Sequence, residues 1–387
     1  MMTKIKLKEL LLVVIGGFSL QTATAQDTAA AVDKGTFTFN GYADVNYFYN
    51  LNNPRSGSNT GSSLVARAFD QKENQFQLGL VQGKMTYVYK KSTVVADIVF
   101  GPHADLGNYG NVVGPLGSTT SLAIKQAYIT HAFSDKFSVT AGQWGTHVGY
   151  EVIDAPLNFN YSLSNCFTNG PFYHTGIKAD FAISSKIALM AGIVNNWDAL
   201  YDNNKYKTVI AQVKIAPSDK LTMYFNYVGG NETTGADSLG TAFNAPDTTK
   251  SFLQLIDFVM NYQVTDQFYV GLNAVVGGMS NADTSMNWGG VALYTNYAFS
   301  DMFTLGARAE YFDNTQGVRA GGKAFQAQSY TLTGKISLAD GRLFFKPEVR
   351  FDLFGKDQTG AFQFEDNQGK FTKPSQLTVG AAAIYKF

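Results

Sequence analysis

The sequence is short of cysteine, proline and charge. Its single cysteine and its balanced charge each exclude a class of site. Of its 387 residues, one is cysteine, nine are proline and 16% are charged. A single cysteine rules out a disulfide scaffold and any metal site built from several thiolates of one chain. The 30 basic and 30 acidic residues balance, so the composition gives no basic surface of the kind that binds nucleic acid. The charged fraction is also well below the roughly 25% of ordinary soluble domains.

Aromatic residues and glycine are abundant instead, with 30 Phe, 21 Tyr and 38 Gly. This composition argues against disorder, which needs few aromatic residues and a high net charge. No apolar run after Leu20 approaches the roughly 20 residues of a transmembrane helix. If the chain spans a membrane, it must do so as a closed β-barrel, because only that alternative satisfies every backbone group in lipid.

The first 25 residues have the features of a cleaved signal peptide. Three lysines precede an apolar segment at 10–20, and a small-x-small sequence at 23–25 precedes Gln26. A membrane anchor is the alternative, but the apolar segment is too short to span a bilayer. We therefore expect a signal peptide at 1–25, a short periplasmic segment at 26–36 and a barrel over 37–387.

Apolar and polar residues alternate along many segments, which is the period of a strand with one apolar face. In GRLFFKPEVRFDL (341–353), for example, charged residues occupy most of the positions between the apolar ones. A phase slip between Leu80 and Met85 predicts a β-bulge near Gly83. The predicted strands are 37–51, 75–91, 93–100, 122–133, 136–147, 172–183, 186–195, 206–216, 219–229, 251–263, 267–277, 288–299, 302–313, 328–338, 341–353 and 376–387.

The connections between these strands alternate between short and long. This alternation is typical of outer-membrane barrels, which have tight periplasmic turns and long extracellular loops. Four of the short turns share the pattern Ser/Thr-Asp-x-apolar, in which we expect the aspartate to bond to its own backbone. Aromatic residues beside the turns predict a girdle at the periplasmic interface. The four turns are SDKF at 134–137, SDKL at 218–221, TDQF at 265–268 and SDMF at 300–303.

The predicted fold class is thus all-β, a single antiparallel transmembrane barrel of about 16 strands. The last strand ends on Phe387, the terminal residue of the sequence. A terminal aromatic residue on a C-terminal strand resembles the assembly signal of outer-membrane barrels, so we expect the barrel assembly machinery to be a partner. Outer-membrane lipid and lipopolysaccharide are further expected partners.

Three stretches of the sequence are similar to a known family. They are FNGYADVNYFYNLNNP (39–54), GTHVGYEVIDAPLNFNYSLSNCFTNGPFYHTGIKADF (145–181) and VNNWDALYDNN (194–204). These stretches resemble the OmpL-like outer-membrane β-barrel porin family, common in Bacteroidetes-type Gram-negative bacteria. The resemblance implies an outer-membrane porin and brings no catalytic residue.

Charged residues occupy inward positions of the predicted strands, where they would line a water-filled lumen. A sixteen-stranded barrel is wide enough to leave a channel unless something plugs it. One hypothesis is a transverse field, with a basic wall on the late strands facing a more acidic wall that together set ion preference. The other is that the charges merely pair locally. The predicted pore-lining residues are Asp44, Asp97, Lys178, Asp180, Asp257, Arg308, Glu310, Lys335, Arg342, Lys346, Glu348 and Arg350.

The connection at 148–171 carries little charge and many aromatic residues. Left outside, it would expose a large apolar patch. Folding into the lumen would bury that surface and narrow the pore, whereas packing on the outer rim or on a partner is the alternative. The predicted constriction residues are Tyr150, Glu151, Asp154, Phe159, Tyr161 and Phe167.

Residues in and beside the same connection resemble those of two other chemistries, a metal site and a hydrolase. His147 and His174 flank it and, with nearby carboxylates, resemble zinc ligands in type but not in specific spacing. Ser162 and Ser164 lie near these histidines, but no Gly-x-Ser-x-Gly sequence of a lipid hydrolase is present there. We therefore expect neither a catalytic site, nor a metal, nor a cofactor, and take Cys166 for a small buried residue.

The sequence predicts an outer-membrane porin that forms a passive diffusion channel for small hydrophilic solutes, with a homo-oligomer as an option for its assembly. Export by the signal peptide would deliver it to the outer membrane of a Gram-negative cell. The alternative is a structural or adhesive barrel that binds a partner through its extracellular loops. An outer-membrane lipid hydrolase is a less favoured alternative.

Overall fold

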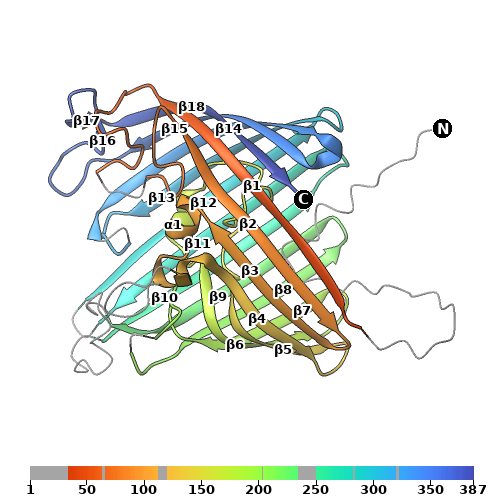
Figure 1. Ribbon diagram of the computed structural model, residues 1–387. Helices are drawn as coiled ribbons and strands as arrows, with labels where there is room; N and C mark the ends of the chain where they lie inside the picture. The colour runs from red at the N-terminus through yellow and green to blue at the C-terminus, as the bar shows by residue number, and fades with distance from the viewer. Residues whose placement is uncertain are drawn as a thin grey trace.

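The computed structural model describes residues 34–62, 66–111, 120–202, 204–233, 250–281, 284–319 and 322–387. The predicted signal peptide and residues 26–33 of the segment 26–36 lie outside these ranges. In the described part, sixteen antiparallel strands form a closed barrel, and β1 pairs with β18 to complete it (Figure 1). None of the helices in these ranges has the length and apolarity needed to cross a membrane.

All sixteen predicted strands are present in the predicted order, so the all-β barrel is confirmed. Their bounds are β1 (Thr36–Asn50), β2 (Gln75–Tyr89), β3 (Ser92–Phe100), β4 (Ile124–Ala132), β5 (Phe137–Gly145), β6 (Tyr173–Ala182), β7 (Ile187–Val194), β8 (Thr208–Ser218), β9 (Leu221–Thr233), β10 (Lys250–Gln263), β11 (Phe268–Ser280), β12 (Ser285–Ala298), β13 (Phe303–Asn314), β14 (Phe325–Leu338), β15 (Leu343–Phe354) and β18 (Ser375–Lys386).

Short elements lie in the connections. They are α1 (Pro102–Gly107), α2 (Asn165–Thr168), the 3-10 turns η2 (Tyr109–Asn111), η3 (Thr120–Ala123) and η7 (Ala339–Gly341), and the pair β16 (Phe364–Glu365) and β17 (Phe371–Lys373). The pair β16–β17 forms a separate two-stranded sheet, which Figure 1 shows at the end of the barrel that carries the long connections.

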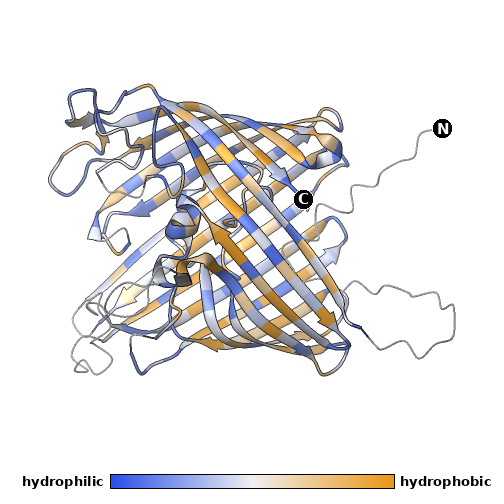
Figure 2. Ribbon diagram, viewed as in Figure 1, coloured by the Kyte–Doolittle hydropathy of each residue, from blue (hydrophilic) through white to orange (hydrophobic). Residues whose placement is uncertain are grey.

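The period-two pattern reflects two different surroundings. In β15, Phe345 and Val349 are exposed on the outer face, whereas Lys346, Glu348 and Arg350 are buried inside. Figure 2 shows the same alternation of apolar and polar residues along the strands. An apolar outer face suits contact with lipid, because charged side chains on that face are costly.

The predicted β-bulge lies in β2, but not at Gly83. Ala43 of β1 pairs with Val81, and Val45 pairs with Leu78, so the extra residue falls at 79–80. The inward carboxylate of Asp44 accepts a hydrogen bond from the backbone N–H of Leu80 at 2.8 Å. The bulge therefore forms where a side chain can bind the backbone group that leaves the ladder.

In the short turns, the hydroxyl residue makes the contacts that we assigned to aspartate. Ser134 Oγ accepts from the backbone N–H groups of Lys136 and Phe137. Thr265 does the same for the second and third residues after it. Ser184 also accepts from the second and third residues after it, although it is followed by serine and not by aspartate. The turns are where the pattern predicts them, but their bonds come from Ser or Thr, as in ST-turns.

Aromatic residues gather on the outer face beside these turns. Phe133 and Phe299 are about 60% and 59% exposed, and each lies beside the phenylalanine at the far side of its turn. The ring centroids of Phe133 and Phe137 are 5.7 Å apart. Their placement fits the girdle expected where the barrel meets the membrane interface.

The terminal residue takes part in closing the barrel. Phe387 and Gly41 exchange two backbone hydrogen bonds, of 3.0 and 3.1 Å. A side chain at Gly41 would place its Cβ 2.0 Å from the carbonyl oxygen of Gln82, so this position requires glycine. The role of Phe387 as an assembly signal remains a prediction.

Candidate channel and its inward-folded loop

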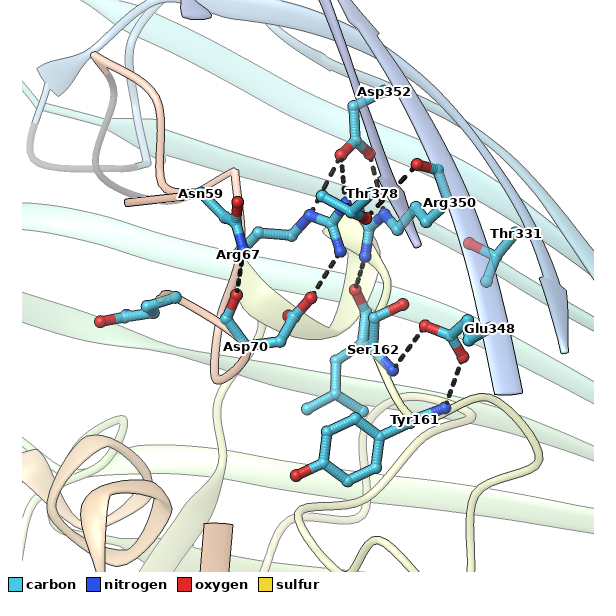
Figure 3. Close-up of polar contacts among 12 residues, drawn as sticks. Asn59, Arg67, Asp70, Tyr161, Ser162, Thr331, Glu348, Arg350, Asp352 and Thr378 are labelled. Carbon is cyan, nitrogen blue, oxygen red and sulfur yellow. Dashed lines mark hydrogen bonds and ion pairs between the residues drawn. The ribbon is translucent and has the colours of Figure 1, made fainter. Parts of the chain in front are cut away.

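The connection 148–171 runs inside the barrel and is held against β13, β14 and β15. Figure 3 shows part of this arrangement, with Tyr161 and Ser162 facing Glu348. The backbone N–H groups of these two residues donate to the Glu348 carboxylate at 2.8 and 3.1 Å. Three further sets of contacts fix the rest of the connection.

Arg308 of β13 forms the most heavily charged of these contacts. Its guanidinium lies 2.6 Å from Glu151 of the connection and 2.7 Å from Glu310 of its own strand. It also donates to the backbone carbonyl of Ser162 at 2.6 Å. The three charged side chains are almost completely buried, so each depends on the others to offset its desolvation.

Two cations of β15 bind backbone carbonyls of the connection. Lys346 Nζ donates to the carbonyls of Ala155 and Asn158 at 2.8 and 2.6 Å. Arg350 donates to the carbonyl of Leu163 at 2.7 Å. The basic side chains of the late strands thus hold the loop.

Inward residues of β1, β10 and β4 also contact the same connection. Tyr161 donates its hydroxyl to Asp44 of β1 at 2.5 Å. Asp257 of β10 accepts from the backbone N–H of Gly149 at 3.1 Å. Asp154 pairs with Lys125 of β4. The connection is therefore attached around the lumen, not at one wall alone.

The aromatic residues of the connection pack against inward residues of the barrel and against one another. Tyr150 stacks on Tyr294 of β12 with ring centroids 3.9 Å apart. Phe167 packs against Phe172 at 5.0 Å. Phe159 occupies the space that a side chain at Gly306 would fill, since a Cβ there would lie 2.3 Å from its ring.

A second connection, between β1 and β2, is also tied to the wall. Figure 3 shows its Arg67 extended toward Asp352, and the two side chains lie 2.9 Å apart. Arg67 also contacts Asp70 at 2.5 Å and Thr378 at 2.7 Å. We did not single out Arg67 from the sequence, because a lone arginine in a long polar connection gives no sign of its distant partner.

The structure places the predicted pore-lining residues in three different settings. Most are buried in contacts with connections or with neighbouring inward side chains, and a smaller group stays partly exposed. Arg342 is exposed in the turn before β15 and does not lie on the strand wall, which corrects its assignment. The buried residues are Asp44, Asp97, Asp257, Arg308, Glu310, Lys346, Glu348 and Arg350, and the partly exposed ones are Lys178, Asp180 and Lys335.

The inward positions nearer the long connections are largely apolar. Ile210, Val228 and Leu255 are fully buried there, and they belong to one cluster with Trp144 and Trp288. Water-exposed charge is found elsewhere, on β6. There the side chains of Lys178 and Asp180 are 22% and 41% exposed and form an ion pair of 3.2 Å. Part of the wet inner wall thus lies on β6, away from the strands that anchor the connection 148–171, whereas Lys335 is partly exposed on β14, which is one of those strands.

The histidines and serines beside this connection have structural partners. His147 lies 5.4 Å from His174, ring to ring, and its Nε2 contacts the carbonyl of Tyr227. Burial lowers the pKa of His147 to about 4, so its ring is neutral. Ser164 caps α2, and Ser162 contacts Arg308. Within the described ranges, no group of three or more His, Cys, Asp or Glu residues could hold a metal ion.

The chain matches one protein family over the whole of its barrel. The family described as "Putative beta-barrel porin-2, OmpL-like" matches residues 36–387. Among curated proteins, none is similar to the chain at a significant level.

Solved outer-membrane proteins share the fold at low sequence identity. An anion-selective porin from Comamonas acidovorans is 9% identical, with a TM-score of 0.57 over 92% of this chain and 100% of that chain. The outer membrane channel DcaP of Acinetobacter baumannii is 10% identical, with a TM-score of 0.56 over 94% and 100%. OmpT of Vibrio cholerae is 12% identical, with a TM-score of 0.56 over 92% and 98%. At such identities the likeness concerns the fold.

Proposed function

The chain belongs to the putative β-barrel porin-2, OmpL-like family, and from that premise we propose that small hydrophilic solutes diffuse through a lumen narrowed by the connection 148–171. The family and the closed barrel make it an outer-membrane porin with a passive channel role. This agrees with the resemblance found in the sequence.

The observation that carries the proposal is the attachment of this connection around the lumen. Its contacts reach inward residues of β1, β4, β10, β13, β14 and β15. The inward charges of β6 lie outside this set and are partly exposed. We therefore place the solute path along β6 and its neighbours, between the connection and that wall.

Single-channel conductance in a planar bilayer tests the proposal. The folded mature chain is expected to give discrete ohmic steps, and deletion of residues 153–168 is expected to increase their size. Charge reversal of Lys178 in Lys178→Glu should shift the reversal potential toward cation preference under a salt gradient. Lys91→Glu, in the exposed turn between β2 and β3, is the matched control. An unchanged conductance after the deletion would reject the constriction.

The apolar inner face favours a second candidate, a closed barrel that binds a partner through its loops. Residues such as Ile210, Leu255 and Trp288 belong to one buried apolar cluster inside the barrel. A folded, heat-modifiable barrel that never conducts would support this candidate over the diffusion channel.

The remaining proposals concern export and partners. We propose that residues 1–25 are removed on export, that the barrel assembly machinery reads Phe387, and that lipid and lipopolysaccharide contact the apolar outer face. One similar structure is of OmpT from Vibrio cholerae in a trimer form, which supports a homo-oligomer as a proposal for this chain. Nothing in the family assignment calls for an enzyme.

A further inference from the structure

A pocket of ≈ 230 Å³ lies where the connections after β1, β3, β5, β7 and β13 meet. It is separate from the contacts that hold the connection 148–171 against β13–β15. Its lining combines aromatic and polar side chains, among them Phe69, Tyr109, Asn169, Phe172, Asp198 and Arg319.

Among the described residues, Arg319 forms no ion pair, although the charge of Asp198 acts on it. Its guanidinium lies 4.9 Å from the ring centroid of Trp197 and 5.7 Å from that of Trp288. Its Nε atom is buried without a hydrogen-bond partner. By contrast, Arg308 and Arg350 have carboxylate oxygens at 2.6 and 2.8 Å. Arg319, which is partly exposed in the connection after β13, has no carboxylate at ion-pair distance among the described residues.

The two tryptophans beside Arg319 also have buried hydrogen-bond donors without partners. The indole N–H groups of Trp197 and Trp288 are buried without an acceptor. Buried donors of this kind normally have a partner. Of these three buried donors, the one on Arg319 belongs to the pocket lining, and it indicates a site for an acceptor group that carries negative charge.

The one carboxylate in the pocket lining is already occupied. Asp198 accepts from the backbone N–H groups of Phe172 and Tyr173 at 2.5 and 3.0 Å, and from the hydroxyl of Tyr109 at 2.8 Å. Asp198 forms no ion pair with Arg319, although the two charges act on each other. The nearby Arg67 is likewise satisfied by Asp70 and Asp352.

We propose that this pocket binds a small organic carboxylate, with the carboxylate group on Arg319 and the apolar body against Phe69 and Phe172. A guanidinium fork matches a carboxylate in two parallel hydrogen bonds. The two phenylalanine rings, 6.1 Å apart, offer the apolar contact. Such a site would concentrate anionic solutes at the end of the barrel that carries the long connections.

Asp198 gives the site a pH dependence. Burial raises the pKa of Asp198 to about 6, so below that pH the pocket loses a negative charge. The groups facing it are Tyr109 and Arg319, together with Arg67, whose charge its two carboxylate partners offset. A carboxylate should therefore bind more tightly at pH 5 than at pH 7.5.

Binding of benzoate to the purified full chain in detergent micelles tests the proposal. Calorimetry gives the affinity, and tryptophan fluorescence gives a local signal, because two of the three tryptophans in the chain flank Arg319. Benzoate should bind saturably and benzyl alcohol, its uncharged analogue, should not. Arg319→Gln should weaken benzoate binding at least tenfold, whereas Arg342→Gln, in an exposed turn, should leave it unchanged. Asp198→Asn should remove the pH dependence.

Three results would overturn the proposal: no saturable benzoate binding by the folded chain, equal binding of benzyl alcohol, or unchanged affinity in Arg319→Gln. If that variant does not fold, Arg319→Lys keeps the charge without the planar fork, and unchanged affinity there would overturn it equally. Because binding is measured without transport, a barrel that does not conduct leaves this result unaffected.

Discussion

Replacing Arg308 by methionine should destabilise the barrel strongly, although the change removes a charge from an inner wall. Arg308 lies within 2.7 Å of both Glu151 and Glu310, and all three side chains are at most 2% exposed. Without the guanidinium, two buried carboxylates face each other with no cation between them. Removing one partner of a buried ion pair costs about 3–5 kcal/mol, a large part of the 5–15 kcal/mol that typically holds a protein folded.

A double-mutant cycle of Arg308→Met and Glu151→Gln should show how much of the lost unfolding free energy comes from leaving Glu151 unpaired. Glu151→Gln alone should cost about 1–3 kcal/mol, because Arg308 keeps Glu310 while one charge-assisted hydrogen bond is lost. The double variant should cost less than the sum of the single ones, since it leaves one carboxylate fewer unpaired.

Urea unfolding of the reconstituted barrel, followed by tryptophan fluorescence and by heat-modifiable migration, measures these free energies. Amide hydrogen exchange across 148–171 shows whether the connection detaches. Arg342→Gln is the control and should change stability by less than about 0.5 kcal/mol, as exposed substitutions do. A cost below about 1 kcal/mol for Arg308→Met, with unchanged exchange in the connection, would refute the anchoring role.

Three further predictions concern a turn, a close contact and a titrating group. Thr265→Val should destabilise the turn between β10 and β11 by about 1 kcal/mol in urea unfolding, whereas Asp266→Ala should not, and the opposite order would restore the role first given to aspartate. Gly306→Ala should displace Phe159, whose ring lies 2.3 Å from the new Cβ, and raise single-channel conductance; an unchanged conductance would show that Phe159 does not narrow the path. The raised pKa of Asp198, about 6, means that the folded chain holds this proton more tightly than an unfolded chain with a pKa near 3.9. Stability should therefore fall as pH rises from about 4 to about 6, and Asp198→Asn, measured by the same unfolding assay, should lose this dependence; a variant that keeps it would assign the effect to another group.

The barrel was predictable because its signal is periodic and local. Apolar and polar residues alternate along each strand and so show which side faces lipid, as in β15, where Phe345 lies outside and Lys346 inside. The short turns carry their own Ser/Thr signal, so the strand order and count followed. The error at Gly83 arose because alternation shows that a phase slip exists but not which residue leaves the ladder.

The partners of the inward charges could not be predicted, because they depend on the path of two connections. Arg350 binds the carbonyl of Leu163, and no side-chain pattern marks a backbone carbonyl as a partner. The sequence also indicated a wet lumen throughout. In β8 and β10 both faces are apolar near the long connections, as at Ile210 and Leu255, so alternation there does not distinguish lipid from a dry interior.

The attachment of the connection 148–171 also constrains the order in which the molecule can mature. Its partners on β13 and β15 lie 145 to 191 residues further along the chain, so these contacts close very long loops and are expected to form late. Before β13–β15 form, the backbone carbonyls of the connection lack the donors Lys346 and Arg350. After these strands form, the two cations need the connection for those hydrogen bonds. A folding intermediate that lacks the last strands should therefore carry this segment undocked and open to protease, and its protection should appear together with closure of β1 on β18.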